Sequence, residues 1–226
     1  MAGDPVVLLH GLWMNGLELG VLRNRLQHEH GFDVYVFSYP TLHGEAGEIC
    51  AELAAFATRA GAGRPVHLVG HSLGGAFVYR ALSECAAGFR GNAVVLGSPL
   101  NGSKAALGAA RFAMIRPLLG PHVLSELAEP KRRSWSGPNA LGSIAGNRRL
   151  GTGQFFAHFD EDNDGTVAVS ETIIPGLADH LVLPHSHIGM LFAEDVARQV
   201  ARFLRNAQFE RDPAYQPPPR ARYSST

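Results

Sequence analysis

The sequence predicts a parallel β-sheet covered on both faces by α-helices. Short apolar runs rich in Val and Leu are typical of buried strands, and they recur at residues 6–9, 34–37, 66–70 and 93–96. Segments with apolar residues at helical spacing lie between them, at 15–26, 44–61 and 73–84. Strands that alternate with helices at this spacing indicate parallel strands joined by crossover helices.

The second half of the chain continues this alternation less regularly. Short strands are predicted at 141–145 and 180–183, and a final helix follows with apolar residues from Met190 to Phe203. From residue 208 the composition becomes polar and rich in proline, which predicts a loosely ordered tail over 208–226. We therefore expect one α/β domain over residues 1–207, with about six strands that are mostly parallel.

Composition and charge exclude several classes of function. The 226 residues are 46% apolar and 18% charged, and 20 basic residues balance 20 acidic ones. The clusters of bases at 131–133 and 148–149 are too short to indicate a surface for nucleic acid or an anionic membrane. No apolar run reaches the roughly 18 residues of a membrane span, and no secretory signal is evident, so we expect a cytoplasmic protein. Cys50 and Cys85 fall in predicted helices and are expected to be small buried side chains, not a disulfide.

The most informative stretch is Gly-His-Ser-Leu-Gly at residues 70–74, which matches the pattern G-x-S-x-G. In a nucleophile elbow, a tight turn from strand to helix strains the serine backbone and lifts the hydroxyl above the sheet. Side chains in place of Gly70 and Gly74 would collide across such a turn. The pattern alone is weak, but a predicted strand precedes it and a predicted helix follows it. Ser72 is therefore a candidate nucleophile.

Three further motifs accompany this turn. A His-Gly turn follows the first strand at 10–11, Asn-Asp-Gly-Thr-Val stands at 163–167, and His187 comes late in the chain. In this order the chain resembles the α/β-hydrolase superfamily and, more narrowly, bacterial lipases and esterases whose acid lies in an Asn-Asp-Gly-x-Val stretch. The resemblance covers about residues 5–206 and implies the α/β-hydrolase fold. It implies a compact, six-stranded version without the two antiparallel leading strands of larger members.

The resemblance also implies a catalytic triad of Ser72, Asp164 and His187, in the chain order of this fold. A serine nucleophile needs a base within hydrogen-bond reach, and the base needs a carboxylate that fixes its tautomer. Asp164 and His187 would each lie on a loop at the carboxyl end of a strand, where open α/β sheets gather their sites. The oxyanion hole would be the main-chain N–H groups of Leu12 and Leu73, the second at a helix N-terminus.

The choice of base among eleven histidines is the weaker step. We expect His10 to brace the turn after the first strand, His71 to point away from the nucleophile, and His180 to be structural. His185 and His187 remain as contenders. His187 is favoured because it directly precedes the helix opening at 188–191, as the family pattern has it.

The acidic loop at 160–171 permits a second interpretation. Its residues match positions 1, 3, 5, 6 and 12 of the EF-hand calcium loop: Asp160, Asp162, Asp164, Gly165 and Glu171. Against calcium, no second loop exists for pairing and Pro175 interrupts the segment that leaves the loop. Asp164 would also have to serve both as metal ligand and as triad acid. We expect no metal here and keep the calcium loop as the alternative.

Residues 101–130 interrupt the alternation of strands and helices. The segment is helical in pattern and carries eight large apolar side chains: Leu107, Phe112, Met114, Ile115, Leu118, Leu119, Leu124 and Leu127. Periodicity does not tell which surface such a segment covers. It is either a helix packed on the sheet, or an insertion over the active site that acts as a lid and lines an acyl pocket.

Together these features predict a serine hydrolase that cleaves carboxylic esters through an acyl-enzyme, similar to lipases and esterases. Trp13, Met14 and Phe112 are candidates for substrate binding, and the expected partner is a small-molecule or lipid ester. The same triad would serve an acyltransferase, a thioesterase or an amidase, and a calcium-binding or non-catalytic member of the fold is the alternative from another class. No cofactor is implied, and the lack of a Gly-rich dinucleotide fingerprint argues against a Rossmann enzyme.

Overall fold

The computed structural model describes residues 3–85, 89–128, 132–151, 153, 156 and 158–211. Its six strands form one sheet in the order β2-β1-β3-β4-β5-β6, and every pairing is parallel. The strands are β1 (Pro5–Leu9), β2 (Asp33–Phe37), β3 (His67–His71), β4 (Ala93–Leu96), β5 (Leu141–Gly146) and β6 (Asp179–Leu183). Each apolar run interpreted as a strand is one, and the predicted α/β-hydrolase fold class is confirmed.

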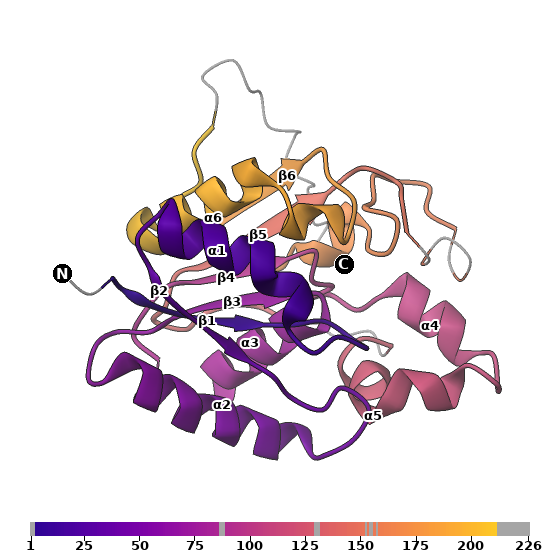
Figure 1. The fold of residues 1–226 in the computed structure, drawn as a ribbon. Coiled ribbons are helices and arrows are strands. Elements are labelled where there is room, and N and C mark those ends of the chain that lie inside the picture. Colours follow the sequence, from indigo (N-terminus) through magenta and orange to yellow (C-terminus); the bar gives the residue numbers. More distant parts are fainter. Residues whose placement is uncertain are drawn as a thin grey trace.

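Helices cover both faces of this sheet. In Figure 1, α1 and α6 lie on one face and α2 and α3 on the other, while α4 and α5 stand at one end of the sheet. The helices are α1 (Gly20–His28), α2 (Ala46–Gly61), α3 (Leu73–Glu84), α4 (Lys104–Ala110), α5 (Arg116–Glu126) and α6 (Glu194–Asn206). Short 3-10 helices are η1 (Leu17–Leu19), η4 (Val169–Thr172) and η5 (Gly189–Leu191).

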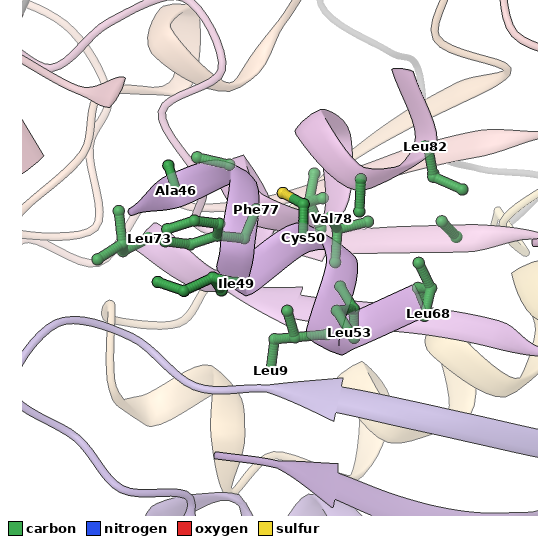
Figure 2. Packing of buried hydrophobic residues seen from close by; sticks show 14 of the residues in the cluster. Leu9, Ala46, Ile49, Cys50, Leu53, Leu68, Leu73, Phe77, Val78 and Leu82 are labelled. Carbon is green, nitrogen blue, oxygen red and sulfur yellow. The ribbon is translucent and has the colours of Figure 1, made fainter. Parts of the chain in front are cut away.

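Alternating strand side chains divide the core into two layers. Val7 and Leu9 of β1 point into a cluster with α2 and α3, whereas Val6 and Leu8 point into a cluster with α1 and α6. Figure 2 shows the first cluster, in which Phe77 is fully buried. Burying such a side chain stabilises the fold by about 1.5–3 kcal/mol. Apolar packing therefore covers both faces of the sheet, so we expect a functional site at the ends of the strands.

The carboxyl ends of the parallel strands meet at one edge of the sheet. β1 lies between β2 and β3, so the chain leaves β1 toward one side and returns on the other. Open α/β sheets bind their ligands at such a switch point, outside the carboxyl ends of the strands. The turns after β1 and β3 and the loops after β5 and β6 all start at this edge. Helices α4 and α5, inserted between β4 and β5, reach the same end of the molecule.

The segment after α6 differs in part from the expected loose tail. Phe209 is buried, and its ring lies 4.7 Å from that of Phe203 between centroids. Its N–H donates to Asp179 Oδ2 at 2.9 Å, and Glu210 N–H donates to the side chain of Gln199 at 2.8 Å. Residues 208–211 therefore belong to the folded domain, because an apolar side chain anchors them. Residues 212–226 of the expected tail lie outside the described residues.

Both cysteines are free thiols, Cys50 buried in α2 and Cys85 partly buried at the end of α3. Within the described ranges, no helix combines the length and apolar character that crossing a bilayer requires.

Candidate active site

Ser72 lies at the sharp turn between β3 and α3. Its backbone dihedrals are φ 54° and ψ −120°. Residues other than glycine rarely adopt this conformation, which costs of order 1–3 kcal/mol of strain energy. A Cβ atom on Gly70 would lie 2.5 Å from the carbonyl oxygen of Gly74, and one on Gly74 would lie 2.5 Å from that of His10. The contact at Gly70 lies across the turn, as the sequence predicted, whereas Gly74 is required by its close contact with the main chain at the end of β1.

Asp164 and His187 form a buried hydrogen-bonded pair. His187 Nδ1 donates to Asp164 Oδ2 at 2.7 Å, and the main-chain N–H of His187 donates to the carbonyl oxygen of Asp164 at 2.9 Å. The two residues are only 1% and 7% exposed. Because the proton lies on Nδ1, Nε2 of a neutral His187 is left as an acceptor. The pair joins the loop that follows β5 to the loop that follows β6.

The carboxylate of Asp164 is held by its own loop as well. Its Oδ1 accepts hydrogen bonds from the main-chain N–H groups of Thr166, at 2.9 Å, and Val167, at 2.7 Å. Gly97, directly after β4, has φ 52°, and a Cβ atom there would lie 2.9 Å from Asp164 Oδ2 and 3.1 Å from His187 Nδ1. This role of Gly97 was not predicted from the sequence, where its only signal was its place at a strand end in Gly-Ser-Pro.

Ser72 and His187 line one cavity of about 320 Å³. Apolar side chains from the α4–α5 insertion form one wall of it: Ala105, Ala106, Ala109, Ile115, Leu119, Val123 and Leu127. Leu119, Val123 and Leu127 also belong to the core cluster packed against α2 and α3. The two interpretations of residues 101–130 thus describe two sides of the same segment. It packs on the core, and it lines the cavity beside Ser72.

The three candidates for substrate binding differ in position. Trp13 and Met14 both line the cavity, and Trp13 Nε1 donates to the carbonyl oxygen of Leu118 at 2.8 Å. Phe112 does not line it. It lies in the segment that joins α4 to α5 and is 54% exposed, and its ring is 6.3 Å from that of Phe156, which does reach the cavity. Helical spacing could not reveal that this position faces outward, so the expectation for Phe112 is corrected.

The turn after β1 is braced by His10, as expected. His10 Nε2 accepts from Tyr39 N–H at 3.2 Å, so Nδ1 carries the proton and donates to the carbonyl oxygen of Gly11 at 3.0 Å. Burial lowers the pKa of His10 and favours this neutral form. Leu12 lines the cavity beyond the turn. Leu73 is the first residue of α3, where main-chain N–H groups have no acceptor within the helix.

Three other histidines, His185, His180 and His71, have different partners. His185 Nε2 lies 2.7 Å from Asp195 Oδ1, a partner outside the cavity lining, so the structure brings His187 and not His185 to Asp164. His180 Nε2 lies 2.9 Å from Thr172 Oγ1, and burial lowers the pKa of His180 to about 4. His71 was expected to point away from the nucleophile, but it lies beside the candidate base. Its ring lies 4.7 Å from that of His187, and it lines the cavity.

The acidic side chains of the 160–171 loop serve separate partners. Asp160 is exposed and lies 3.1 Å from His158, while Asp164 binds His187. Glu171 is buried, and its two oxygens accept from the N–H groups of Lys104, at 2.6 Å, and Ala168, at 2.9 Å. Burial raises the pKa of Glu171 to about 7. Among the residues that the structure describes, no three His, Cys, Asp or Glu side chains gather as metal ligands would.

Comparisons with known proteins agree with this architecture. A family model described as "Alpha/beta hydrolase family" matches residues 6–223. A search of curated proteins by sequence found no match. Mature lipase from Bacillus licheniformis superposes with a TM-score of 0.68 at 21% identity, over 84% of this chain and 87% of that one.

Two further solved structures extend the comparison. A monoacylglycerol lipase from Paleococcus ferrophilus gives a TM-score of 0.60 at 18% identity, over 89% of this chain and 95% of that one. A metagenomic carboxyl esterase gives 0.58 at 20% identity, over 83% of this chain and 65% of that one. At these identities the similarity shows a shared fold.

Proposed function

This chain belongs to the alpha/beta hydrolase family, and we propose that within it the protein is a serine hydrolase that cleaves carboxylic esters. The observation that carries the proposal is the 2.7 Å hydrogen bond from His187 Nδ1 to Asp164 Oδ2, beside a cavity lined by both Ser72 and His187. A carboxylate that orients an imidazole next to an elbow serine is the arrangement that acyl transfer to serine needs.

In the proposed reaction, Ser72 Oγ attacks the ester carbonyl carbon while His187 Nε2 takes the hydroxyl proton. Asp164 holds the imidazole in this tautomer and stabilises the imidazolium that forms. His187 then gives the proton to the leaving alcohol, and an acyl-Ser72 remains. Water attacks this acyl-enzyme by the same route, which releases the acid and restores the hydroxyl of Ser72.

The oxyanion that forms in each half-reaction needs donors that are already in place. We assign this role to the main-chain N–H groups of Leu12, in the turn after β1, and Leu73, at the start of α3. Each such donor typically contributes about 10²–10³ in kcat. The bonds of His10 to Tyr39 and Gly11 support this role because they hold the turn that carries Leu12.

The apolar wall of the cavity supports a substrate with an apolar acyl group. Three large apolar side chains that line the cavity are also exposed: Trp13 is 61%, Leu150 59% and Ile188 41% exposed. Exposed apolar side chains that gather at one site typically mark a place where apolar ligands or partners bind. An ester of a longer-chain acid would cover these exposed apolar side chains, whereas an acetate ester would leave most of the apolar wall without contact to the substrate.

Hydrolysis of p-nitrophenyl esters of increasing chain length tests the proposal. We expect turnover by the wild-type protein and a loss in kcat of about a millionfold in a folded Ser72→Ala variant. Full turnover by that variant would overturn the assignment of Ser72. Faster cleavage of a matched thioester or anilide would keep the nucleophile but change the reaction class.

A further inference from the structure

His71 is a buried polar side chain that the proposed mechanism does not use. It is 1% exposed and lies at the end of β3, directly before Ser72. Its Nε2 is 2.9 Å from the main-chain carbonyl oxygen of His187. A carbonyl oxygen only accepts hydrogen bonds, so Nε2 of His71 carries the proton and donates it.

The opposite side of the His71 ring faces the turn after β1. A Cβ atom on Gly11 would lie 3.3 Å from His71 Nδ1 and 3.3 Å from Ser72 Cβ. Nδ1 is buried and has no hydrogen-bond partner among the described residues. The ring thus stands between the turn that carries Leu12 and the loop that carries His187, with Ser72 beside it.

The charge state of His71 suits a permanent donor. Burial, and secondly the nearby His187, lower the pKa of His71 to about 3. His71 therefore stays neutral at neutral and alkaline pH, where a serine hydrolase works through a neutral base. It does not compete with His187 for the proton that Ser72 releases, and its Nε2–H remains available throughout the cycle.

We propose that His71 is a positioning residue, whose Nε2–H bond to the carbonyl oxygen of His187 holds that base beside Ser72. The inference rests on the proposed function. Asp164 fixes His187 through its ring and its N–H group, and His71 fixes it through the carbonyl oxygen on the other side of the same residue. Without the second bond, the loop after β6 could shift while the bond to Asp164 persists.

Two variants separate the hydrogen bond from the bulk of the ring. His71→Phe keeps a flat ring but removes the donor, and His71→Gln places an amide N–H near the position of Nε2. A misplacement of about 1 Å at a reacting group can cost about 100-fold, so we expect kcat on p-nitrophenyl acetate to fall about 10- to 100-fold in His71→Phe. KM should change little, because the apolar wall formed by the α4–α5 insertion is untouched. His71→Gln should recover most of kcat.

A control on the same strand distinguishes positioning from stability. His67 lies four residues earlier, so its side chain is on the same face of β3, and its Nδ1 accepts from Asn92 N–H at 2.9 Å. His67→Phe should lower the melting temperature and leave kcat of the folded protein unchanged. His71→Phe should lower kcat and the rate of fluorophosphonate labelling, measured per folded molecule.

Should His71→Phe not fold, His71→Asn compared with His71→Gln gives the same contrast, because the shorter amide does not reach the carbonyl oxygen. Wild-type kcat in folded His71→Phe, or equal losses in the Asn and Gln variants, would overturn the inference alone. A wild-type protein that neither labels nor hydrolyses esters would overturn the proposed function and this inference with it.

Discussion

Two regions meet at the cavity, and they are built in different ways. At the edge of the sheet, Asp164 is held by three hydrogen bonds to its carboxylate, from Thr166, Val167 and His187. The wall formed by α4 and α5 has an interruption inside α5, where Gly120 has φ 71° and Pro121 follows. Met114, on the corner between the two helices, is 89% exposed, whereas Leu119 on the inner side is 4% exposed.

This difference in construction indicates that the edge of the sheet determines the rate of reaction and that the wall determines which substrates bind. Directional bonds and close glycine contacts fix the reacting groups at the edge, so small changes there should cost much activity. Apolar packing holds the wall, and such packing tolerates substitutions that keep the volume roughly constant. We therefore expect changes at the edge to act on kcat for every substrate, and changes in the wall to act selectively.

The largest effect should come from the acid at the edge. Asp164→Asn removes the acceptor that fixes the tautomer of His187, so we expect kcat to fall by about 10⁴ with a modest change in KM. Asp160→Asn and Asp162→Asn are the matched controls on the same loop and should stay within about a fewfold of wild type, since neither side chain is expected to touch the imidazole.

The same variants test the calcium alternative. Equal losses at all three aspartates, each reproduced by EDTA in the wild-type protein, would contradict the assignment of Asp164 and favour a calcium loop. A loss of kcat confined to Asp164→Asn, which EDTA does not reproduce, would support Asp164 as the triad acid.

Glu171 connects the edge and the wall, and it should make stability depend on pH. Burial raises its pKa from 4.5 to about 7, which corresponds to at most about 3 kcal/mol. Because the folded pKa is the higher one, the protonated form contributes this stability below pH 4.5, and it is lost as the pH rises through about 7.

Urea unfolding at about pH 5 and pH 8 measures this contribution. Glu171→Gln cannot ionise, so its stability should change less between the two pH values than that of the wild type. Identical pH dependence in both proteins would show that the Glu171 carboxyl group is not the source. The difference between the two proteins is the decisive quantity, because every other titrating group is common to them.

The smallest effect should be the selective one in the wall. Ile115 lines the cavity and is partly buried, so Ile115→Trp should fill part of the acyl site. Each acyl methylene that can no longer be buried in the cavity should cost up to about 0.8 kcal/mol of binding free energy, or roughly fourfold in kcat/KM. The loss in kcat/KM should therefore grow with acyl-chain length and be slight for acetate esters. Phe112→Trp, outside the cavity lining, is the control. Equal losses for all chain lengths would contradict the assigned role of the wall.

Much of the fold and of the candidate site could be predicted from the sequence, because these features depend on residues that are close together in the chain or on short motifs. The six strands follow from short apolar runs, because a strand buried on both faces needs apolar residues at nearly every position. The strain at Ser72 follows from the spacing of Gly70 and Gly74, whose missing side chains permit the turn. The pairing of Asp164 with His187 was expected from motif order, and the hydrogen bond between them is present.

Contacts between distant segments were not predictable in this way. Phe112 fits the helical apolar pattern yet faces outward, because the corner between α4 and α5 decides its direction. His71 was expected to point away from the nucleophile, but the loop after β6 brings the carbonyl oxygen of His187 to its ring. Phe209 anchors a segment whose polar composition predicted disorder. In two of these cases the partner lies far away in the sequence: His187 is 116 residues from His71, and Asp179 is 30 residues from Phe209.

Labelling with a fluorophosphonate, followed by mapping of the modified residue by mass spectrometry, tests the central claim most directly. The reagent reports only an activated serine, so it needs no knowledge of the natural substrate. We expect stoichiometric labelling of the folded wild-type protein at Ser72 and none in Ser72→Ala. Labelling at another residue, or no labelling of the folded wild-type protein, would contradict it.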